Sequence, residues 1–186
     1  MLEESLELTR ALGDSGGVAW SMMNLGDVAQ RDGDYGTAVA LSEKSLAPGR
    51  ELGFKGVTAW SLMVLADVAR RRGDLPRATR LYRKALAHHW EMGQRRSAVQ
   101  CLERLAVVAA ASGQASAAVR LYAAAQVGRE GARAPLPPTE QTDYQEALTA
   151  TRLAMGDEAV AAAAAEGRAM TLEQAIEHAV AAGSPA

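Results

Sequence analysis

The residues from Gly13 to Gly17 read GDSGG, a string that surrounds the nucleophilic serine in one class of serine protease. That mechanism needs a histidine base and an orienting aspartate, and in this class both precede the serine along the chain. Only 14 residues precede Ser15, and none of them is a histidine. The string therefore predicts a turn that contains Ser15, and it does not predict acyl-transfer chemistry.

The other residue types that carry chemistry do not have catalytic or metal-binding spacing. His88 and His89 are adjacent, so on a helix their side chains point about 100° apart and cannot readily chelate one ion. We expect these two histidines and His178 to be structural or exposed, and Cys101 to be a buried small hydrophobic residue. The carboxylates form no pair suited to acid–base work, and there is no glycine-rich phosphate-binding loop. The sequence predicts no enzyme, no cofactor and no metal.

Composition restricts the fold class and the compartment. Of the 186 residues, 48% are hydrophobic but only 4% are aromatic. An aliphatic, alanine-rich core of this kind favours closely packed helices over a β-sandwich. The single cysteine excludes an internal disulfide and fits a reducing compartment, and no apolar run is long enough to span a membrane. We therefore expect a cytoplasmic protein that does not enter the membrane.

The chain repeats itself every 40 residues, which is typical of a solenoid built from stacked helix pairs. Residues 19–58 and 59–98 align closely, and residues 99–138 form a weaker third copy. In the first copy, apolar residues at helical spacing run up to Gly33, and Asp34 is a suitable N-cap for a second helix. One repeat position holds only small residues, which would let neighbouring helices approach closely: Gly26, Ala66 and Ala106.

Two segments depart from this pattern. Pro48 lies inside a predicted second helix, where it removes a backbone donor, so we expect a kink or an early end. After Gly128 the repeat gives way to GREGARAPLPP, and residues 139–186 are predicted to form a helical cap on repeats that occupy residues 1–138. Within the cap we expect helices over residues 140–155, 159–165 and 172–182, the last begun by a capping box of Thr171 and Gln174.

Residues 24–38, NLGDVAQRDGDYGTA, resemble the tetratricopeptide repeat in its longer, 40-residue variety. With the tail, the chain resembles the C-terminal region of large bacterial transcriptional regulators of the LuxR and maltose-regulator types, which join an NTPase and a DNA-binding module to such repeats. This resemblance implies an all-α, right-handed superhelix of antiparallel helix pairs with a C-terminal helical cap. It further implies a non-catalytic sensing or interaction domain. A freestanding adaptor protein is the alternative, and an enzyme is the least favoured reading.

In the resembled family the first helices of the repeats line a concave groove, and their ligand-facing positions recur along one stripe. The matching residues here, which we term the first-helix stripe, are Trp20, Met23, Asp27, Gln30, Trp60, Met63, Asp67, Arg70, Gln100 and Glu103. Tryptophan, methionine and acidic groups together suit a protein, a peptide or a small-molecule effector. The alternative interpretation is that Trp20 and Trp60 pack between successive helices.

Charge is distributed unevenly along the chain although the net charge is only −2. Residues 59–98 carry nine Lys or Arg against three Asp or Glu, a balance of +6. Residues 139–186 carry two against eight, a balance of −6. A basic cluster of this kind is usually a solvated helix face, and the whole chain lacks a basic excess, so we expect no direct nucleic-acid contact.

The first 18 residues align with the second helix of a repeat, which makes them a half repeat. We expect further repeats to precede Met1 in a longer protein, a standalone protein with a half-repeat cap being the alternative. In either case the apolar face around Leu2, Leu6 and Leu8 should promote self-association.

Overall fold

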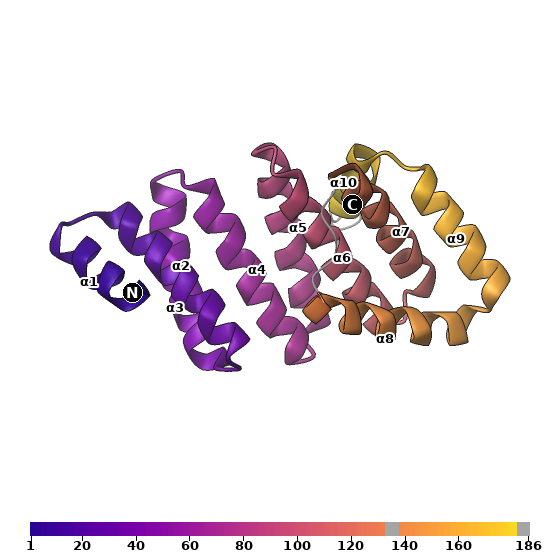
Figure 1. Ribbon diagram of the computed structural model, residues 1–186, viewed down its shortest axis with the longest axis horizontal. Helices are drawn as coiled ribbons and strands as arrows, with labels where there is room; N and C mark the ends of the chain where they lie inside the picture. Colours follow the sequence, from indigo (N-terminus) through magenta and orange to yellow (C-terminus); the bar gives the residue numbers. More distant parts are fainter. Residues whose placement is uncertain (133–137, 182–186) are drawn as a thin grey trace. The chain divides into compact units, whose positions relative to one another are not determined.

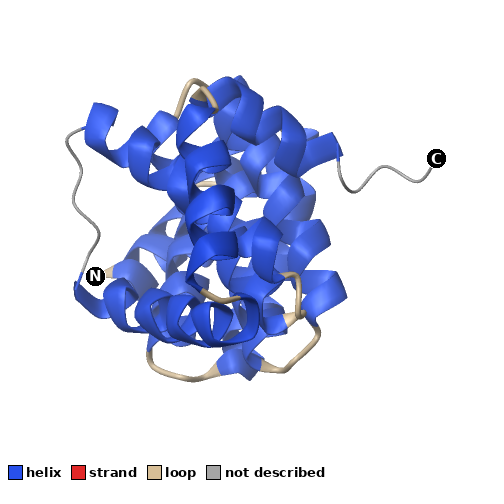
Figure 2. Ribbon diagram, turned by 90° about the vertical axis from the view of Figure 1, so that its right-hand side faces the viewer, coloured by secondary structure: helices blue, strands red, loops and turns tan. Residues whose placement is uncertain are grey.

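The computed structural model describes residues 1–132 and 138–181, and this part of the chain is all-helical, which confirms the predicted fold class (Figures 1 and 2). The chain divides into two compact units, an N-terminal unit (Met1–Met92) and a C-terminal unit (Gly93–Ala186). The helices of the N-terminal unit are α1 (Leu2–Ala11), α2 (Ser15–Arg31), α3 (Tyr35–Glu51), α4 (Lys55–Arg71) and α5 (Leu75–Glu91). Those of the C-terminal unit are α6 (Arg95–Ala111), α7 (Ala115–Ala132), α8 (Pro138–Met155), α9 (Asp157–Ala169) and α10 (Leu172–Ala181).

Successive helices in the repeats are joined by the same short turn. The turn at Gly33 has φ 83°, and the Gly33 and Asp34 amides donate to the carbonyl oxygens of Gln30 and Ala29 at 3.2 and 2.9 Å. This is a Schellman ending, in which glycine adopts the left-handed conformation at little cost. Asp34 then caps α3 by accepting a hydrogen bond from the Thr37 amide, so one residue closes one helix and begins the next.

These turns recur at intervals of 20 residues, which is half of the repeat found in the sequence. The glycine of each turn has φ between 67° and 83°: Gly13, Gly33, Gly53, Gly73, Gly93 and Gly113. Asp14 and Asp74 are N-caps like Asp34, as their side chains accept hydrogen bonds from the amides of Gly17 and Arg77. The prediction that the turn contains Ser15 is wrong by one position, because Ser15 is the first residue of α2 and GDSGG spans the end of the turn and the start of the helix.

The helices of the N-terminal unit approach one another closely at small residues. A Cβ built on Gly26 of α2 would lie 2.9 Å from the Ser42 hydroxyl of α3, as expected for the small-residue position. Between one repeat and the next, serine hydroxyls meet in pairs: Ser5 with Ser21 at 3.2 Å and Ser45 with Ser61 at 2.6 Å. Each pair satisfies two hydroxyls in a site that admits only small side chains.

The expectation that Pro48 ends its helix early is wrong. Helix α3 runs through Pro48 to Glu51 and has the same length as α5, which carries His88 at the equivalent position. The last turn holds because the Leu52 amide donates to the Pro48 carbonyl at 2.9 Å, and the Phe54 amide donates to the Gly49 carbonyl at 2.8 Å. Proline removes only its own amide hydrogen bond, and these bonds close the turn around it.

In the C-terminal unit the hairpin of α6 and α7 packs against the tail helices. Helix α9 packs most extensively on α7, and it is longer than the predicted 159–165. The predicted helices 140–155 and 172–182 correspond to α8 and α10, except that residue 182 lies outside the described residues. Thr171 and Gln174 form the predicted capping box, each amide donating to the other's side chain.

The two compact units have other bounds than the predicted division into repeats (1–138) and cap (139–186). The C-terminal unit contains the third hairpin together with the tail helices. Within the described residues, no helix is both long enough and apolar enough to cross a lipid bilayer.

Candidate protein-interaction surface

The first-helix stripe divides into accessible and buried side chains. Trp20 is 51% exposed, and five further members are partly accessible: Asp27, Gln30, Trp60, Arg70 and Gln100. Four members are buried: Met23, Met63, Asp67 and Glu103. In the N-terminal unit the accessible members lie on α2 and α4, whereas Gln100 and Glu103 belong to α6 in the C-terminal unit.

The two tryptophans occupy equivalent positions but have different surroundings. Trp60 packs against a cluster of Ala19, Met23 and Val57, and its ring meets the His89 ring edge-on at a centroid distance of 5.8 Å. The helix that covers Trp60 is α2, the first helix of the preceding repeat. The helix before α2 is α1, which aligns with the second helix of a repeat and not with the first, and Trp20 is half exposed. Trp60 thus contributes to inter-helix packing, while Trp20 offers an aromatic ring to solvent.

The aspartates of the stripe also differ between repeats. Asp67 is 4% exposed and accepts a hydrogen bond from the Tyr82 hydroxyl of α5 at 2.5 Å. At the position of Tyr82 the first repeat has Ser42, and Asp27 instead forms an ion pair with Arg31, one turn further along α2, at 2.7 Å. Asp67 therefore joins the two helices of its repeat, whereas Asp27 lies on a polar, accessible face.

Glu103 is held inside the C-terminal unit. Its carboxylate is 1% exposed and receives hydrogen bonds from Nε and Nη2 of Arg129 on α7, a side chain that is itself 12% exposed. Bidentate pairing of this kind is the geometry by which a buried charge is tolerated. Burial raises the pKa of Tyr122, and the charge of Glu103 raises it further. The surroundings of Glu103 thus assign it to the interior of the unit.

Phe54 is an accessible aromatic residue that sequence reasoning missed. It is 44% exposed and occupies the N-cap position of α4, where α2, α3 and α5 have aspartate. Its ring lies over the start of α2, because a Cβ built on Gly16 would fall 2.5 Å from the ring edge. Gly16 is one helical turn before Trp20 on the same face of α2. The replacement of the capping aspartate by phenylalanine was the signal in the sequence.

A comparison with models of protein families found a match that lies on α2 to α5. The tetratricopeptide repeat model matches residues 18–51 and 58–87, which include most of α2 to α5. These two segments of the chain are similar to tetratricopeptide repeats. A comparison with curated proteins found no match. The tetratricopeptide match covers both tryptophans and both aspartates discussed above, and tetratricopeptide repeats serve protein–protein interaction in general.

His89 and Cys101 are buried, whereas His178 is exposed. On α5, His89 is 2% exposed and packs against Trp60, and His88 is half-buried. Cys101 is fully buried at the position that Ser21 and Ser61 hold in the earlier repeats. In the part of the chain that the structure describes, no three His, Cys, Asp or Glu side chains could hold a metal ion together.

The basic cluster of the second repeat, which consists of the arginines and the lysine from Arg70 to Lys84, lies mostly in solvent. Arg77 pairs with Glu43 of α3 at 3.6 Å, with both side chains about half exposed. Arg83 is more enclosed, and burial lowers its pKa. The other exposed members are Arg71, Arg72, Arg80 and Lys84.

The apolar N-terminal face is partly covered within the chain. Leu6 is buried where α1 packs on α2, and Leu2 is partly buried, whereas Leu8 is 61% exposed. Of the three leucines expected to promote self-association, Leu8 is the one that remains open to solvent, and Leu12 in the following turn is 72% exposed.

Proposed function

We propose that this chain is the protein-interaction domain of a larger bacterial transcriptional regulator, and that it binds a segment of a partner protein. The observation that carries the binding part is the half-exposed Trp20 ring. Around it lie accessible polar groups of the first-helix stripe on α2, and Phe54 covers the same face one turn earlier. Exposed aromatic rings beside polar groups are the usual anchors of protein interfaces.

The regulator part of the proposal is supported by the repeats and by the tail. Its NTPase and DNA-binding modules would lie outside this chain, which has no phosphate-binding loop. Binding of a partner segment, or of a small-molecule effector, would bias those modules in the cytoplasm. Sequencing the reading frame upstream tests this part. An upstream phosphate-binding loop supports the regulator, whereas a frame without one would favour a freestanding adaptor.

The binding part is tested with peptides selected from a displayed library on the full chain. Trp20→Ala should weaken the selected peptide by about 30-fold or more, since a central aromatic anchor contributes roughly 2 kcal/mol or more. Leu8→Ala is the matched control, because Leu8 is also an exposed apolar residue but lies on α1. Equal affinity of the parent and the Trp20→Ala variant would refute the proposed site.

Trp60→Ala separates stability from recognition in the same experiment. Because Trp60 packs against Ala19, Met23 and Val57, its truncation should lower the free energy of unfolding by roughly 2–4 kcal/mol. Truncation of the exposed Trp20 should cost less than about 1 kcal/mol. Melting curves of both variants, read beside the peptide affinities, distinguish a lost anchor from a lost fold.

A further inference from the structure

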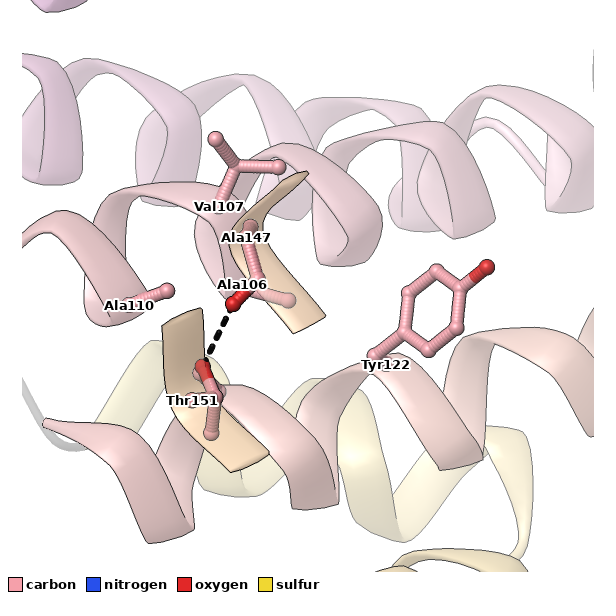
Figure 3. Close-up of a pocket in the computed structure, with 7 residues that line it drawn as sticks. Ala106, Val107, Ala110, Tyr122, Ala147 and Thr151 are labelled. Atoms are coloured by element: carbon pink, nitrogen blue, oxygen red, sulfur yellow. Dashed lines mark hydrogen bonds between the residues drawn. The ribbon is translucent and has the colours of Figure 1, made fainter. Parts of the chain in front are cut away.

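Helix α8 lies on the part of the third repeat that continues the first-helix stripe. In the 40-residue alignment Val107 and Ala110 of α6 are equivalent to Asp67 and Arg70 of α4. The polar pair of the earlier repeats has become an apolar pair in the third. Figure 3 shows Val107 and Ala110 beside Ala147 and Thr151 of α8.

The contact between α8 and the third repeat is small and apolar. A narrow cavity separates the helices, and its lining consists of Ala106, Val107, Ala110, Ala118, Tyr122, Ala147 and Thr151. The Thr151 hydroxyl donates to the Ala147 carbonyl at 2.7 Å within α8 itself. No hydrogen bond from Thr151 to α6 is therefore needed, and the side chain can pack on α6 through its methyl group.

Few of the described side chains of α8, which lie between residues 146 and 155, are buried. Among those described, Thr151 is 4% exposed, Ala147 and Met155 are partly buried, and the remainder are exposed, with Leu153 at 85%. By comparison, α4 and α6, the first helices of the second and third repeats, bury most of their length.

The neighbouring helix α9 packs directly on α7, and this contact does not involve α8. A Cβ built on Gly167 of α9 would lie 2.2 Å from the Arg120 carbonyl oxygen of α7, which is a direct contact between helix backbones. Gly156, which joins α8 to α9, has φ 81° and no atom within 4 Å of a built Cβ. Rotation of α8 about this open glycine would leave the contact between α9 and α7 in place.

We propose that α8 is a displaceable, in-chain occupant of the third repeat, and that a partner helix with the same face takes its place. The surface under α8 admits small side chains, so the partner must present two small residues one turn apart, as Ala147 and Thr151 do. The remainder of that partner helix would be polar, as most of α8 is. This inference concerns α6 to α8 only, so it can fail or hold independently of binding at Trp20.

Hydrogen exchange of the unmodified full chain is the first test. If α8 is displaceable, the amides of residues 149–155 should exchange at least about 10-fold faster than those in the middle of α7 and α9, because opening of α8 is local. Exchange of these amides at the same rate as in α7 would overturn the proposal.

The second test releases α8 with one substitution. Thr151→Glu places a carboxylate in the apolar cavity between α8 and the third repeat and should speed exchange in α8 by a further factor of about 10 or more without changing α6, α7 or α9. Leu153→Glu, on the exposed side of the same helix, is the matched control and should leave exchange unchanged. Loss of protection throughout α6, α7 and α9 in Thr151→Glu would show that α8 is an integral part of the fold and would overturn the proposal.

The third test supplies the occupant separately. A fluorescent peptide of residues 138–155 should bind the Thr151→Glu chain at least about 10-fold more tightly than the parent, whose own α8 competes with it. Adding Val107→Asp, which restores the acid of the earlier repeats, should abolish this gain. Equal affinity of the peptide for the parent and for Thr151→Glu would overturn the proposal, as would undiminished binding after Val107→Asp.

Discussion

Removing Arg129 from its ion pair with Glu103 should lower the free energy of unfolding by a large amount. Arg129→Ala leaves a carboxylate that is 1% exposed without its bidentate partner. Breaking a buried pair in this way costs about 3–5 kcal/mol, because the remaining charge has lost both water and counter-ion. For a chain of this length, each kcal/mol lowers the melting temperature by roughly 2–4 °C, so a fall of roughly 6–20 °C is expected.

Urea denaturation followed by circular dichroism measures this cost. Arg31→Ala is the control, because Arg31, which pairs with Asp27, has a side chain that is 70% exposed, so loss of the pair should cost less than about 1 kcal/mol. Replacing both Glu103 and Arg129 by methionine should recover most of the loss, since no charge is then left buried. If Arg129→Ala is no more destabilising than Arg31→Ala, the assignment of Glu103 to the interior is wrong, and the residue is available for a ligand.

Three further predictions concern single positions. Gly167→Ala should lower the free energy of unfolding by about 1–3 kcal/mol, because the added Cβ would collide with α7. Gly131→Ala is the control: a Cβ at Gly131 would meet no atom within 4 Å, so this variant should be neutral or more stable. Thermal melting of the two variants measures the difference. Pro48→Ala should raise the melting temperature by restoring an amide donor, and a fall would show that the proline ring contributes to packing. A hydrogen bond from Thr37 lowers the pKa of Asp34 below its ordinary value of 3.8, so its stabilisation is present above that pH and is lost as pH falls. Urea denaturation between about pH 2 and 6 should show a weaker pH dependence in Asp34→Asn, which keeps the cap at every pH, and an unchanged slope would contradict this cause.

Local signals predicted most of the fold. Gly33 and Asp34 specify a helix end and a helix start within adjacent residues, and their equivalents recur along the chain, so the positions of the repeat helices could be predicted without tertiary information. The capping box of Thr171 and Gln174 is equally local. The early helix end expected as one outcome at Pro48 did not occur, because neighbouring backbone hydrogen bonds hold the last turn in place.

The candidate site was less predictable because exposure depends on the neighbouring helix. Trp20 and Trp60 have the same residue type, repeat position and following serine, and no local property distinguishes them. They differ in their surroundings, because Ala19 and Met23 of α2 pack against Trp60, whereas Trp20 is 51% exposed. Sequence spacing placed both rings on one helix face correctly, and only the structure could show which ring is accessible.

The role of a stripe position is set by the residue opposite it on the second helix. In the three repeats, positions 27, 67 and 107 are Asp, Asp and Val, and positions 42, 82 and 122 are Ser, Tyr and Tyr. Asp67 pairs with Tyr82, whereas Ser42 is too short for that bond and Asp27 turns to Arg31 on its own helix. Val107 offers no acceptor to Tyr122 and lies beside α8 instead. The repeat therefore determines the position of a stripe side chain on its helix. The residue opposite it on the second helix determines whether that side chain bonds across the hairpin, as Asp67 does, stays accessible, as Asp27 does, or packs beside another helix of the chain, as Val107 does.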